Sequence, residues 1–439
     1  MSNSVRLADF IEKQIAGCWG EPNRDRKNQL EVLCVRGTDL SSINLMNFDR
    51  VPRRFIPNKQ SNRLLGQNSI IIEVSGGSSN QSTGRVGFIS SQAGNIVCSN
   101  FCRGLVIREG YDARFFYYVL QNVYNSNIFF NYESKTTGIK NLLINTAFEN
   151  ILVPKFHLDT QKIISEVLSQ IDEKIQINLK SNIALESLAK LIYDYWFLQF
   201  DFPDENGKPY KSSGGKMVYN KELKREIPEG WKTAFFDSYI AKDKSGDWGK
   251  ESEQGNYTLN VNCIRGADIN GIKGQGNIKC PDRFILQKNA HKLIESGDIV
   301  VEISGGSPTQ STARVAYINN GVLNRFDAPL ISSNFCRVIT LNQPNWVYSF
   351  FQEWQFLYDA DFFFGWEGKT SGIKNFLFEQ FLGNYKTVIP SEKLLNNYNS
   401  AVSDNYNKIQ MNLLENQRFA ELRDWLLPML MNGQVTIKD

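Results

Sequence analysis

Histidine is almost absent from this sequence. The 439 residues include only 2 His and 7 Cys, and the cysteines are odd in number and scattered along the chain. A structural zinc site needs closely spaced ligands of these two types, and a disulfide scaffold needs cysteines that can pair. The sequence therefore predicts neither kind of site.

Long apolar runs and an excess of one charge are also missing. No stretch reaches the ~18 consecutive apolar residues of a membrane-spanning helix, and the first residues hold no apolar segment of signal-peptide length. We therefore expect a cytoplasmic protein. The formal net charge of only +3 excludes a histone-like polycation but permits contact with nucleic acid if the cations cluster.

Catalytic signatures are absent as well. The sequence contains neither the [DN]PP[YF] and FxGxG motifs of amino-methyltransferases nor a GxxxxGK[ST] phosphate-binding loop, because position 363, before Gly368-Lys369-Thr370, is Phe. The lysine of a PD-(D/E)xK nuclease core is missing after Pro281-Asp282. We therefore predict a binding protein with no catalytic residues and no cofactor or metal of its own.

What the sequence contains instead is a duplication. The segment EVSGGSSNQSTGRVGFI at 73–89 returns as EISGGSPTQSTARVAYI at 302–318, an offset of 229 with 11 of 17 positions identical. KTTGIKNL at 135–142 returns as KTSGIKNF at 369–376, an offset of 234. The second copy therefore has 234 − 229 = 5 extra residues, somewhere between positions 90 and 332. A repeat this long is typical of a duplicated domain rather than of a solenoid.

Each copy has a mixed α/β part followed by a long helix. Short β-rich runs lead into loops rich in Gly, Ser and Thr, and aromatic-rich helices are predicted at 115–126 and 347–359. The segment 158–197 has no Pro or Gly, and its apolar residues recur mostly three and four apart. The matching helix is predicted from about Ser391 to Leu427, just before Pro428. Helices of about 60 Å, at 1.5 Å per residue, favour an antiparallel coiled coil.

Polar residues occupy the predicted seam of both helices. A strict heptad places Asn178 and Asn182 there, and the offset of 234 places Asn412 and Asn416 at the same two levels. We interpret them as asparagines that pair across the coiled coil and fix its register. The alternative is a local stutter that turns them toward solvent.

Two repeated loops are candidates for contact with nucleic acid. SGGSSNQSTGR at 75–85 and its repeat concentrate backbone N–H groups, hydroxyls and an arginine, which suits phosphate binding, and their glutamines could pair with adenine. KTTGIK at 135–140 and its repeat place two lysines beside small residues that allow close approach to a phosphate strand. The candidate residues are Gln81, Arg85, Gln310 and Arg314 in the first loop, and Lys135, Thr136, Thr137, Gly138, Lys140, Lys369, Thr370, Ser371, Gly372 and Lys374 in the second.

These residues can also have purely structural roles. The Gly/Ser loops can be ordinary turns, and the repeated arginines 36/265 and 103/337 can form internal salt bridges, for example to Asp39 or Asp268. The copies diverge most at 41–66 against 270–295 and at 104–134 against 338–368. If the common residues build the frame and hold phosphates, these divergent segments are where two different sequences could be read.

In their order and duplication, these blocks resemble the DNA-specificity subunit of type I restriction–modification systems along nearly the whole chain. LIYDYWFLQFDFPDENGKPYKSSGGKMVYN at 191–220, IPEGWK at 227–232 and LRDWLLPMLMNGQV at 422–435 add to the likeness. The resemblance implies two target-recognition domains that each read half of a split DNA site, helices that set the gap between the halves, and no catalytic activity. It also implies a complex with two adenine-methylating modification subunits and with restriction subunits, so S-adenosylmethionine, ATP and Mg are expected on those partners.

The resemblance divides the chain into target-recognition domain 1 (1–155), spacer helix 1 (156–200), a connector (201–224), target-recognition domain 2 (225–389), spacer helix 2 (390–432) and a C-terminal tail (433–439). The expected fold class is α+β, with two mixed α/β domains separated by two long helices in an antiparallel coiled coil and internal pseudo-two-fold symmetry. Partner-binding residues are expected on an exposed apolar strip at the helix ends, at Tyr193, Trp196, Phe197, Trp425 and Leu426. The alternative function is an assembly scaffold that binds two protein subunits without reading sequence.

Overall fold

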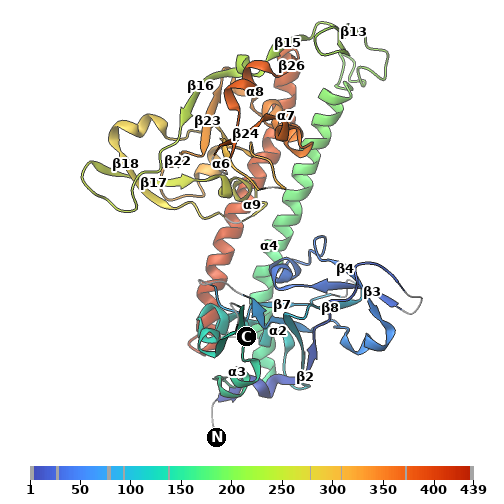
Figure 1. Ribbon diagram of the computed structural model, residues 1–439, viewed down its shortest axis with the longest axis vertical. Coiled ribbons are helices and arrows are strands. Elements are labelled where there is room, and N and C mark those ends of the chain that lie inside the picture. Colours follow the sequence, from blue (N-terminus) through green and yellow to red (C-terminus); the bar gives the residue numbers. More distant parts are fainter. Residues whose placement is uncertain are drawn as a thin grey trace. The chain divides into compact units, whose positions relative to one another are not determined.

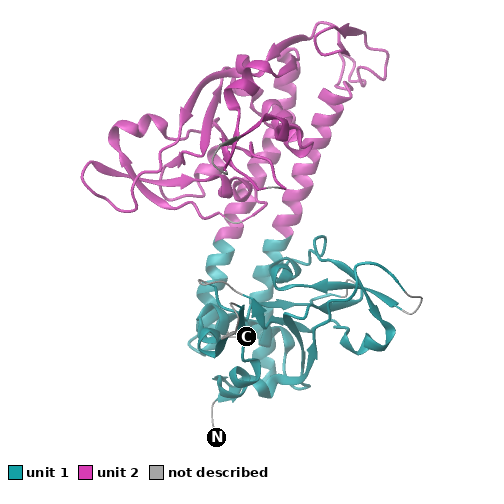
Figure 2. Ribbon diagram, viewed as in Figure 1, with its two compact units in different colours: residues 1–176, 418–439 teal, residues 177–417 magenta. Residues whose placement is uncertain are grey.

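The computed structural model describes residues 4–25, 29–76, 81–91, 94–136, 139–276, 278–307, 309–370 and 373–435. Two long helices, α4 (Leu158–Tyr193) and α9 (Glu392–Met431), connect to compact α/β domains (Figure 1). The chain divides into unit 1, residues 1–176 and 418–439, and unit 2, residues 177–417 (Figure 2). Each unit therefore holds one α/β domain with a part of both helices. The segment boundaries that the resemblance implies stay predictions.

Four small sheets form the α/β domain in the described part of unit 1. One runs β2-β9-β5-β7 and is antiparallel throughout, one runs β4-β3-β8 with β3 and β8 parallel, one runs β10-β11-β6, and β1 pairs with β12. The strands are β1 (Ser4–Arg6), β2 (Ile11–Ala16), β3 (Gln29–Val35), β4 (Arg53–Pro57), β5 (Ile70–Glu73), β6 (Ser75–Gly76), β7 (Val86–Phe88), β8 (Ile96–Cys98), β9 (Cys102–Ile107), β10 (Glu133–Thr136), β11 (Ile139–Leu142) and β12 (Leu152–Pro154). The shorter helices are α1 (Leu40–Asn44), α2 (Ala113–Asn125) and α3 (Ile144–Asn150).

Unit 2 repeats this topology strand by strand, in the orders β16-β23-β19-β21, β18-β17-β22, β20-β25-β24 and β15-β26. Even a bulge recurs, between Ile11 and Lys13 in unit 1 and between Ile240 and Lys242 in unit 2. The strands are β15 (Lys232–Phe235), β16 (Ile240–Ser245), β17 (Tyr257–Ile264), β18 (Asp282–Leu286), β19 (Ile299–Glu302), β20 (Ser304–Gly305), β21 (Val315–Tyr317), β22 (Leu330–Ser332), β23 (Cys336–Leu341), β24 (Glu367–Thr370), β25 (Ile373–Phe376) and β26 (Lys386–Ile389). The helices are α5 (Ile269–Ile272), α6 (Asn320–Leu323), α7 (Val347–Asp359) and α8 (Phe378–Asn384), and a hairpin of β13 (Met217–Asn220) and β14 (Arg225–Pro228) precedes the domain.

The five extra residues of the second copy lie between β21 and β22. The offset of equivalent strands is 229 up to β7 and β21, and 234 from β8 and β22 onward. The intervening segment of unit 2 holds helix α6, for which the described residues of unit 1 have no counterpart. Asn319, which caps α6, donates a hydrogen bond from Nδ2 to Oδ1 of Asn407 on α9 at 3.0 Å. The insertion thus packs against the long helix.

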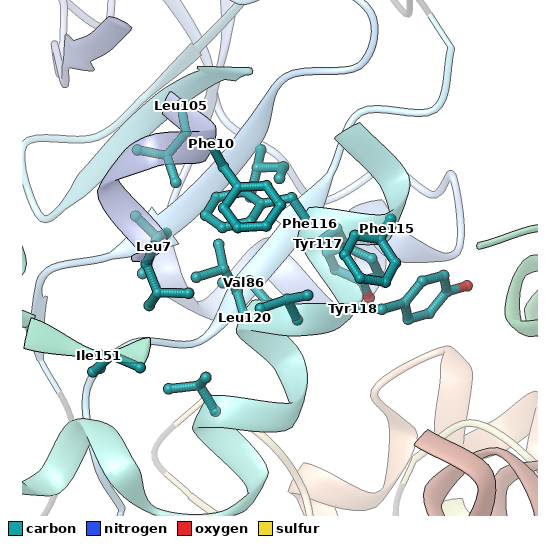
Figure 3. Close-up of a cluster of buried hydrophobic side chains, with 14 of the residues drawn as sticks. Leu7, Phe10, Val86, Leu105, Phe115, Phe116, Tyr117, Tyr118, Leu120 and Ile151 are labelled. Atoms are coloured by element: carbon teal, nitrogen blue, oxygen red, sulfur yellow. The ribbon is translucent and has the colours of Figure 1, made fainter. Parts of the chain in front are cut away.

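The core of unit 1 joins the α/β domain to the long helices. Aromatic side chains of α2 pack beneath the β2-β9-β5-β7 sheet, and Phe10 stacks on Phe116 with ring centroids 4.6 Å apart (Figure 3). The same core takes in apolar side chains of both long helices, namely Ile164, Leu168, Leu427, Leu430 and Met431. Burial of this apolar surface fixes the helices to the domain. Unit 2 builds an equivalent core around α7.

Helix α9 continues through Pro428 to Met431, beyond the end predicted at Leu427. A proline in the last turn removes only one intrahelical hydrogen bond, to the carbonyl of the residue four positions earlier. Leu430 and Met431, which follow the proline, are buried in the core of unit 1. Their burial offsets the cost of the missing bond, so the helix extends by a further turn.

The asparagines of the two helices pair within unit 2. Nδ2 of Asn178 donates to Oδ1 of Asn416 at 2.8 Å, and Nδ2 of Asn412 donates to Oδ1 of Asn182 at 2.8 Å. In both pairs the two residue numbers add to 594. A constant sum is expected for antiparallel helices, because one residue number rises as its partner's number falls. All four side chains are buried. The predicted antiparallel pairing is confirmed, and the alternative in which these residues face solvent is wrong.

We expect the pairing to make two double variants behave differently. Asn178 and Asn412 belong to different pairs, so N178L/N412L breaks both Asn–Asn bonds. The buried amide of Asn182 then loses its bond to Asn412, at a cost of about 1–3 kcal/mol. N182L/N412L replaces one whole pair by apolar side chains and should be nearly neutral. Urea unfolding of both variants beside the parent measures the difference. Equal stabilities of the two variants would contradict the pairing.

Candidate nucleic-acid interface

The two repeated loops predicted separately from the sequence meet in unit 1. Lys140 of β11 places Nζ 3.2 Å from Oε2 of Glu133 and donates to the main-chain carbonyl of Gln81 at 3.2 Å. The other carboxylate oxygen of Glu133 accepts hydrogen bonds from the backbone N–H and hydroxyl of Thr83, at 2.7 and 3.1 Å. The Gly/Ser loop and the β10–β11 hairpin therefore form one continuous surface.

Unit 2 builds the same arrangement from equivalent residues. Nζ of Lys374 lies 3.0 Å from Oε2 of Glu367 and donates to the carbonyl of Gln310 at 3.4 Å. Glu367 in turn accepts from the N–H and the hydroxyl of Thr312, at 2.8 and 3.2 Å. A network that recurs at this level of detail is part of the common frame of the two domains.

The loop arginines make internal pairs with buried carboxylates. Arg85 donates to both oxygens of Glu73, at 2.9 and 2.6 Å, and Arg314 donates likewise to Glu302, at 2.8 and 2.5 Å. These bonds raise the pKa of both guanidinium groups. A Cβ added to Gly76, which has φ +140°, would lie 2.8 Å from Oε1 of Glu73, so only glycine fits beside the carboxylate.

A second pair of arginines follows the same pattern. Arg36 makes a bidentate contact with Asp39 at 2.9 and 2.8 Å, and Arg265 does so with Asp268 at 2.8 and 3.0 Å. For these two residues, the alternative of an internal salt bridge is therefore confirmed. Arg337 also pairs internally, with Asp243.

The structure does not place every candidate residue. Thr137, Gly138, Ser371 and Gly372 lie outside the described residues, and the side chains of Lys135, Thr136, Lys369 and Thr370 are not described. Gln81 is exposed and Gln310 partly so. Lys140, Lys374, Arg85 and Arg314 already hold carboxylate partners, so they are not the free cations that the sequence suggested. Contact of any of these residues with DNA stays a prediction.

A cleft that sequence analysis missed adjoins this surface in unit 1. It has a volume of about 780 Å³, and its lining includes Trp19, Phe101 and Ile139 together with the paired residues Arg85 and Glu73. These residues come from segments far apart in the sequence. Two repeats could have indicated the cleft residues: Trp19-Gly20 returns as Trp248-Gly249, and SNFCR at 99–103 returns at 333–337. The sequence alone assigned no role to either repeat.

Exposed cations of unit 1 occur in the first divergent segment. Arg50, Arg53 and Lys59 are exposed on or beside β4. Arg54 stacks its guanidinium over the ring of Trp19 at 4.3 Å, and Arg283 does the same over Trp248 at 4.0 Å. Arg54 therefore attaches this segment to a residue that both domains share, whereas its other cations remain at the surface.

Comparison with known proteins agrees with this architecture. A family model described as the type I restriction modification DNA specificity domain matches residues 5–187. The specificity subunit of the type I restriction enzyme MjaIX from Methanocaldococcus jannaschii is 22% identical over 357 residues, covering 81% of this chain and 76% of the relative. The predicted resemblance to the DNA-specificity subunits of type I restriction–modification systems is confirmed.

Two further similar proteins are matched over most of their own length. The HindI specificity subunit of Haemophilus influenzae is 21% identical, over 63% of this chain and 67% of the relative. The crystal structure of a type I restriction–modification S subunit from M. genitalium aligns with a TM-score of 0.52 at 16% identity, covering 99% of this chain and 96% of that one. The latter likeness concerns the fold, and it agrees with the predicted α+β class and coiled coil. The family model and both curated relatives are named as specificity domains or subunits, which agrees with the prediction of a binding protein.

The expected exposure of the predicted partner-binding strip needs a correction. Tyr193 and Phe197 are buried in the core of unit 2, where their rings lie 6.2 and 5.0 Å from that of Tyr398. Helical periodicity does not tell which face of a long helix its own domain covers, and here the domain covers these two residues. Trp196 and Leu426 are partly buried, and Trp425 is exposed.

The described residues contain neither a metal-binding cluster nor a membrane-spanning helix. Among them, no group of three or more His, Cys, Asp or Glu side chains is arranged to hold a metal ion. Burial raises the pKa of the Cys34 and Cys263 thiols to about 12, so these side chains behave as apolar core residues. No helix in the same part of the chain is both long and apolar enough to cross a membrane.

We expect alanine at Lys140 to act mainly on stability. The substitution leaves Glu133 buried without its cation, which should cost about 2 kcal/mol, whereas the slope of DNA affinity against salt should not change, because the lysine charge is already neutralised. The double variant K140A/E133Q should recover most of the stability. Urea unfolding and DNA titrations at several salt concentrations measure both effects. A slope reduced by about 1 with unchanged stability would instead make Lys140 a phosphate contact.

Proposed function

We propose that this specificity subunit recognises a split DNA target, one half with each α/β domain, and directs methyltransferase and restriction subunits to it. The main support is that the two units share one topology, whereas their sequences diverge at 41–66 against 270–295 and at 104–134 against 338–368. A common frame with different surface segments suits two readers of different short sequences. Phosphate contacts fix position, and contacts to base edges give specificity.

The divergent segments are anchored to the long helices, which supports a spacer role. In unit 1, Gln176 of α4 donates from Nε2 to the carbonyl of Asn44 at 2.8 Å, and in unit 2 its counterpart Gln410 of α9 donates to the carbonyl of Ile272 at 3.2 Å. Half-sites about one helical turn apart, ~34 Å, lie on the same face of B-DNA. Helices that hold each reader rigidly would therefore act as the ruler between half-sites.

The partners in this proposal are double-stranded DNA, two modification subunits and restriction subunits. S-adenosylmethionine, ATP and Mg belong to those subunits, and the complex acts in the cytoplasm. Exposed apolar side chains of the long helices, such as Ile177, Ile183 and Met411, support a partner-binding role for the helices, because such a strip left open favours aggregation. The DNA-facing candidates are the divergent segments, together with Lys135 and Lys369 of the second repeated loop as phosphate contacts.

Single-molecule methylome sequencing tests the proposal. Cells expressing this chain with its neighbouring methyltransferase should acquire a split motif with adenine methylated in both halves. Exchange of residues 41–66 for the corresponding segment of another specificity subunit should change one half of the motif and leave the other half unchanged. An assembled complex that produces no methylated motif would favour the alternative, an assembly scaffold that does not read sequence.

A further inference from the structure

Exposed apolar side chains recur at equivalent positions of the two units. Trp19 corresponds to Trp248, Phe101 to Phe335 and Ile139 to Ile373, and all six side chains are between 37% and 55% exposed. Phe130 and Phe364 share this symmetry in the two domains, as do three pairs on the long helices, Ile177/Met411, Leu188/Leu422 and Leu191/Trp425. Leu152, by contrast, is 60% exposed and corresponds to Lys386. Apolar side chains that are exposed at equivalent positions therefore indicate a surface that has the same role in both units.

In unit 1 these side chains line a single cleft. Trp19 follows β2, Phe101 precedes β9 and Ile139 begins β11, and all three contribute to the cleft of about 780 Å³ described above. The stacking of Arg54 on Trp19 at 4.3 Å, matched by Arg283 on Trp248 at 4.0 Å, holds the indole in place. A preformed concave site with aromatic anchors binds at low entropic cost.

The charges in the cleft argue against a polyanionic occupant. Arg85 is neutralised by Glu73, and Arg36 by Asp39, in bidentate pairs. DNA affinity depends on cations that neutralise phosphates, and these two are already engaged. A neutral cleft with exposed aromatic side chains and a polar rim instead complements an apolar protein surface.

The residues that are the same in both domains also restrict the kind of ligand that the cleft can bind. Residues that are the same in both domains cannot distinguish two different half-sites. They suit a ligand that the complex contains twice in identical form. We propose that the Trp19/Phe101/Ile139 cleft of unit 1 receives an apolar segment of one modification subunit, and that the equivalent side chains Trp248, Phe335 and Ile373 of unit 2 bind the same segment of a second one. This proposal rests on the proposed function, which supplies two identical modification subunits.

Assembly measurements with variants of each copy test this proposal. Native mass spectrometry of the full chain titrated with purified modification subunit should give a 2:1 complex for the parent. Phe101→Asp and Phe335→Asp should each weaken one of the two sites at least about tenfold, so a 1:1 complex accumulates, and the double variant should weaken both. Phe101→Ala, which adds no charge, should act in the same direction. Leu152→Asp is the matched control and should assemble normally, and circular dichroism melting verifies folding of every variant.

Two outcomes would overturn the proposal. Normal assembly combined with weaker DNA binding by the complex would make the cleft a DNA surface, and normal assembly with normal DNA binding would leave it without this role. Failure of the proposed function is recognised separately, because it would appear as a parent complex that assembles at 2:1 but methylates no split motif.

Discussion

Replacing Arg314 by alanine is expected to destabilise unit 2 by about 3–5 kcal/mol, because it leaves a buried carboxylate without its cation. Glu302 is almost completely buried and accepts both hydrogen bonds of the pair from Arg314. Arg85→Ala should act in the same way on unit 1, with a smaller cost because the Arg85 side chain is more exposed, at 29% against 13%. Hydrogen–deuterium exchange followed by mass spectrometry should place each effect in the unit that carries the substitution.

A double variant separates the buried charge from other effects. In R314A/E302Q the carboxylate becomes a neutral amide, and most of the lost stability should return. The sequence suggested these arginines as phosphate contacts, which gives a different expectation. Variants with parental stability whose complex shows a smaller salt dependence of DNA binding would support that role and contradict the structural one.

The duplication made much of the fold predictable. Because EVSGGSSNQSTGRVGFI recurs with a constant offset, the two domains had to share strands and turns, and β5 with β7 reappears as β19 with β21. The paired asparagines were predictable for a similar reason, since the heptad placed them at matching levels. The pairing of Asn178 with Asn416 follows from antiparallel direction alone.

The candidate site was harder to predict, because its chemistry depends on contacts across strands. Glu73 and Arg85 stand in the same quoted segment, but only the register of β5 against β7 places them together. Lys140 finds Glu133 because β10 and β11 form a hairpin. The cleft unites Trp19, Phe101 and Ile139 from three distant segments, a grouping that no local pattern encodes. Internal repetition marks such residues as shared without telling which are structural.

The two units should also differ in their response to pH, through Glu353 of α7. Burial raises the pKa of this carboxyl from 4.5 to about 7, against the opposing effects of the hydrogen bond from Thr387 and the charge of Arg225. Tyr385 also donates to it, at 3.4 Å. The positions equivalent to Glu353, Tyr385 and Thr387 in unit 1 are Val119, Ile151 and Val153. The polar cluster is therefore peculiar to unit 2.

The sign of the effect follows from proton uptake. Between pH 4.5 and about 7 the folded state holds a proton on Glu353 that the unfolded chain has released, so stability falls as pH rises through this range and stays low above it. At 1.36 kcal/mol per pKa unit, the full loss is about 3 kcal/mol. Glu353→Gln, which is neutral at every pH, should abolish this part of the pH dependence, and Glu353→Val, the residue of the other copy, should do so too.

Urea unfolding at pH 5 and pH 8 measures this difference, with exchange of α7 amides to locate it. Glu353→Gln should match the parent at pH 5 and exceed it at pH 8, whereas Glu379→Gln, which removes an exposed carboxylate of α8, should follow the parent at both values. Parallel curves for the parent and Glu353→Gln would mean that Glu353 ionises in the folded state much as it does in the unfolded chain. In that case water or Arg225 must solvate the carboxylate, and α7 of unit 2 would be as indifferent to pH as α2 of unit 1.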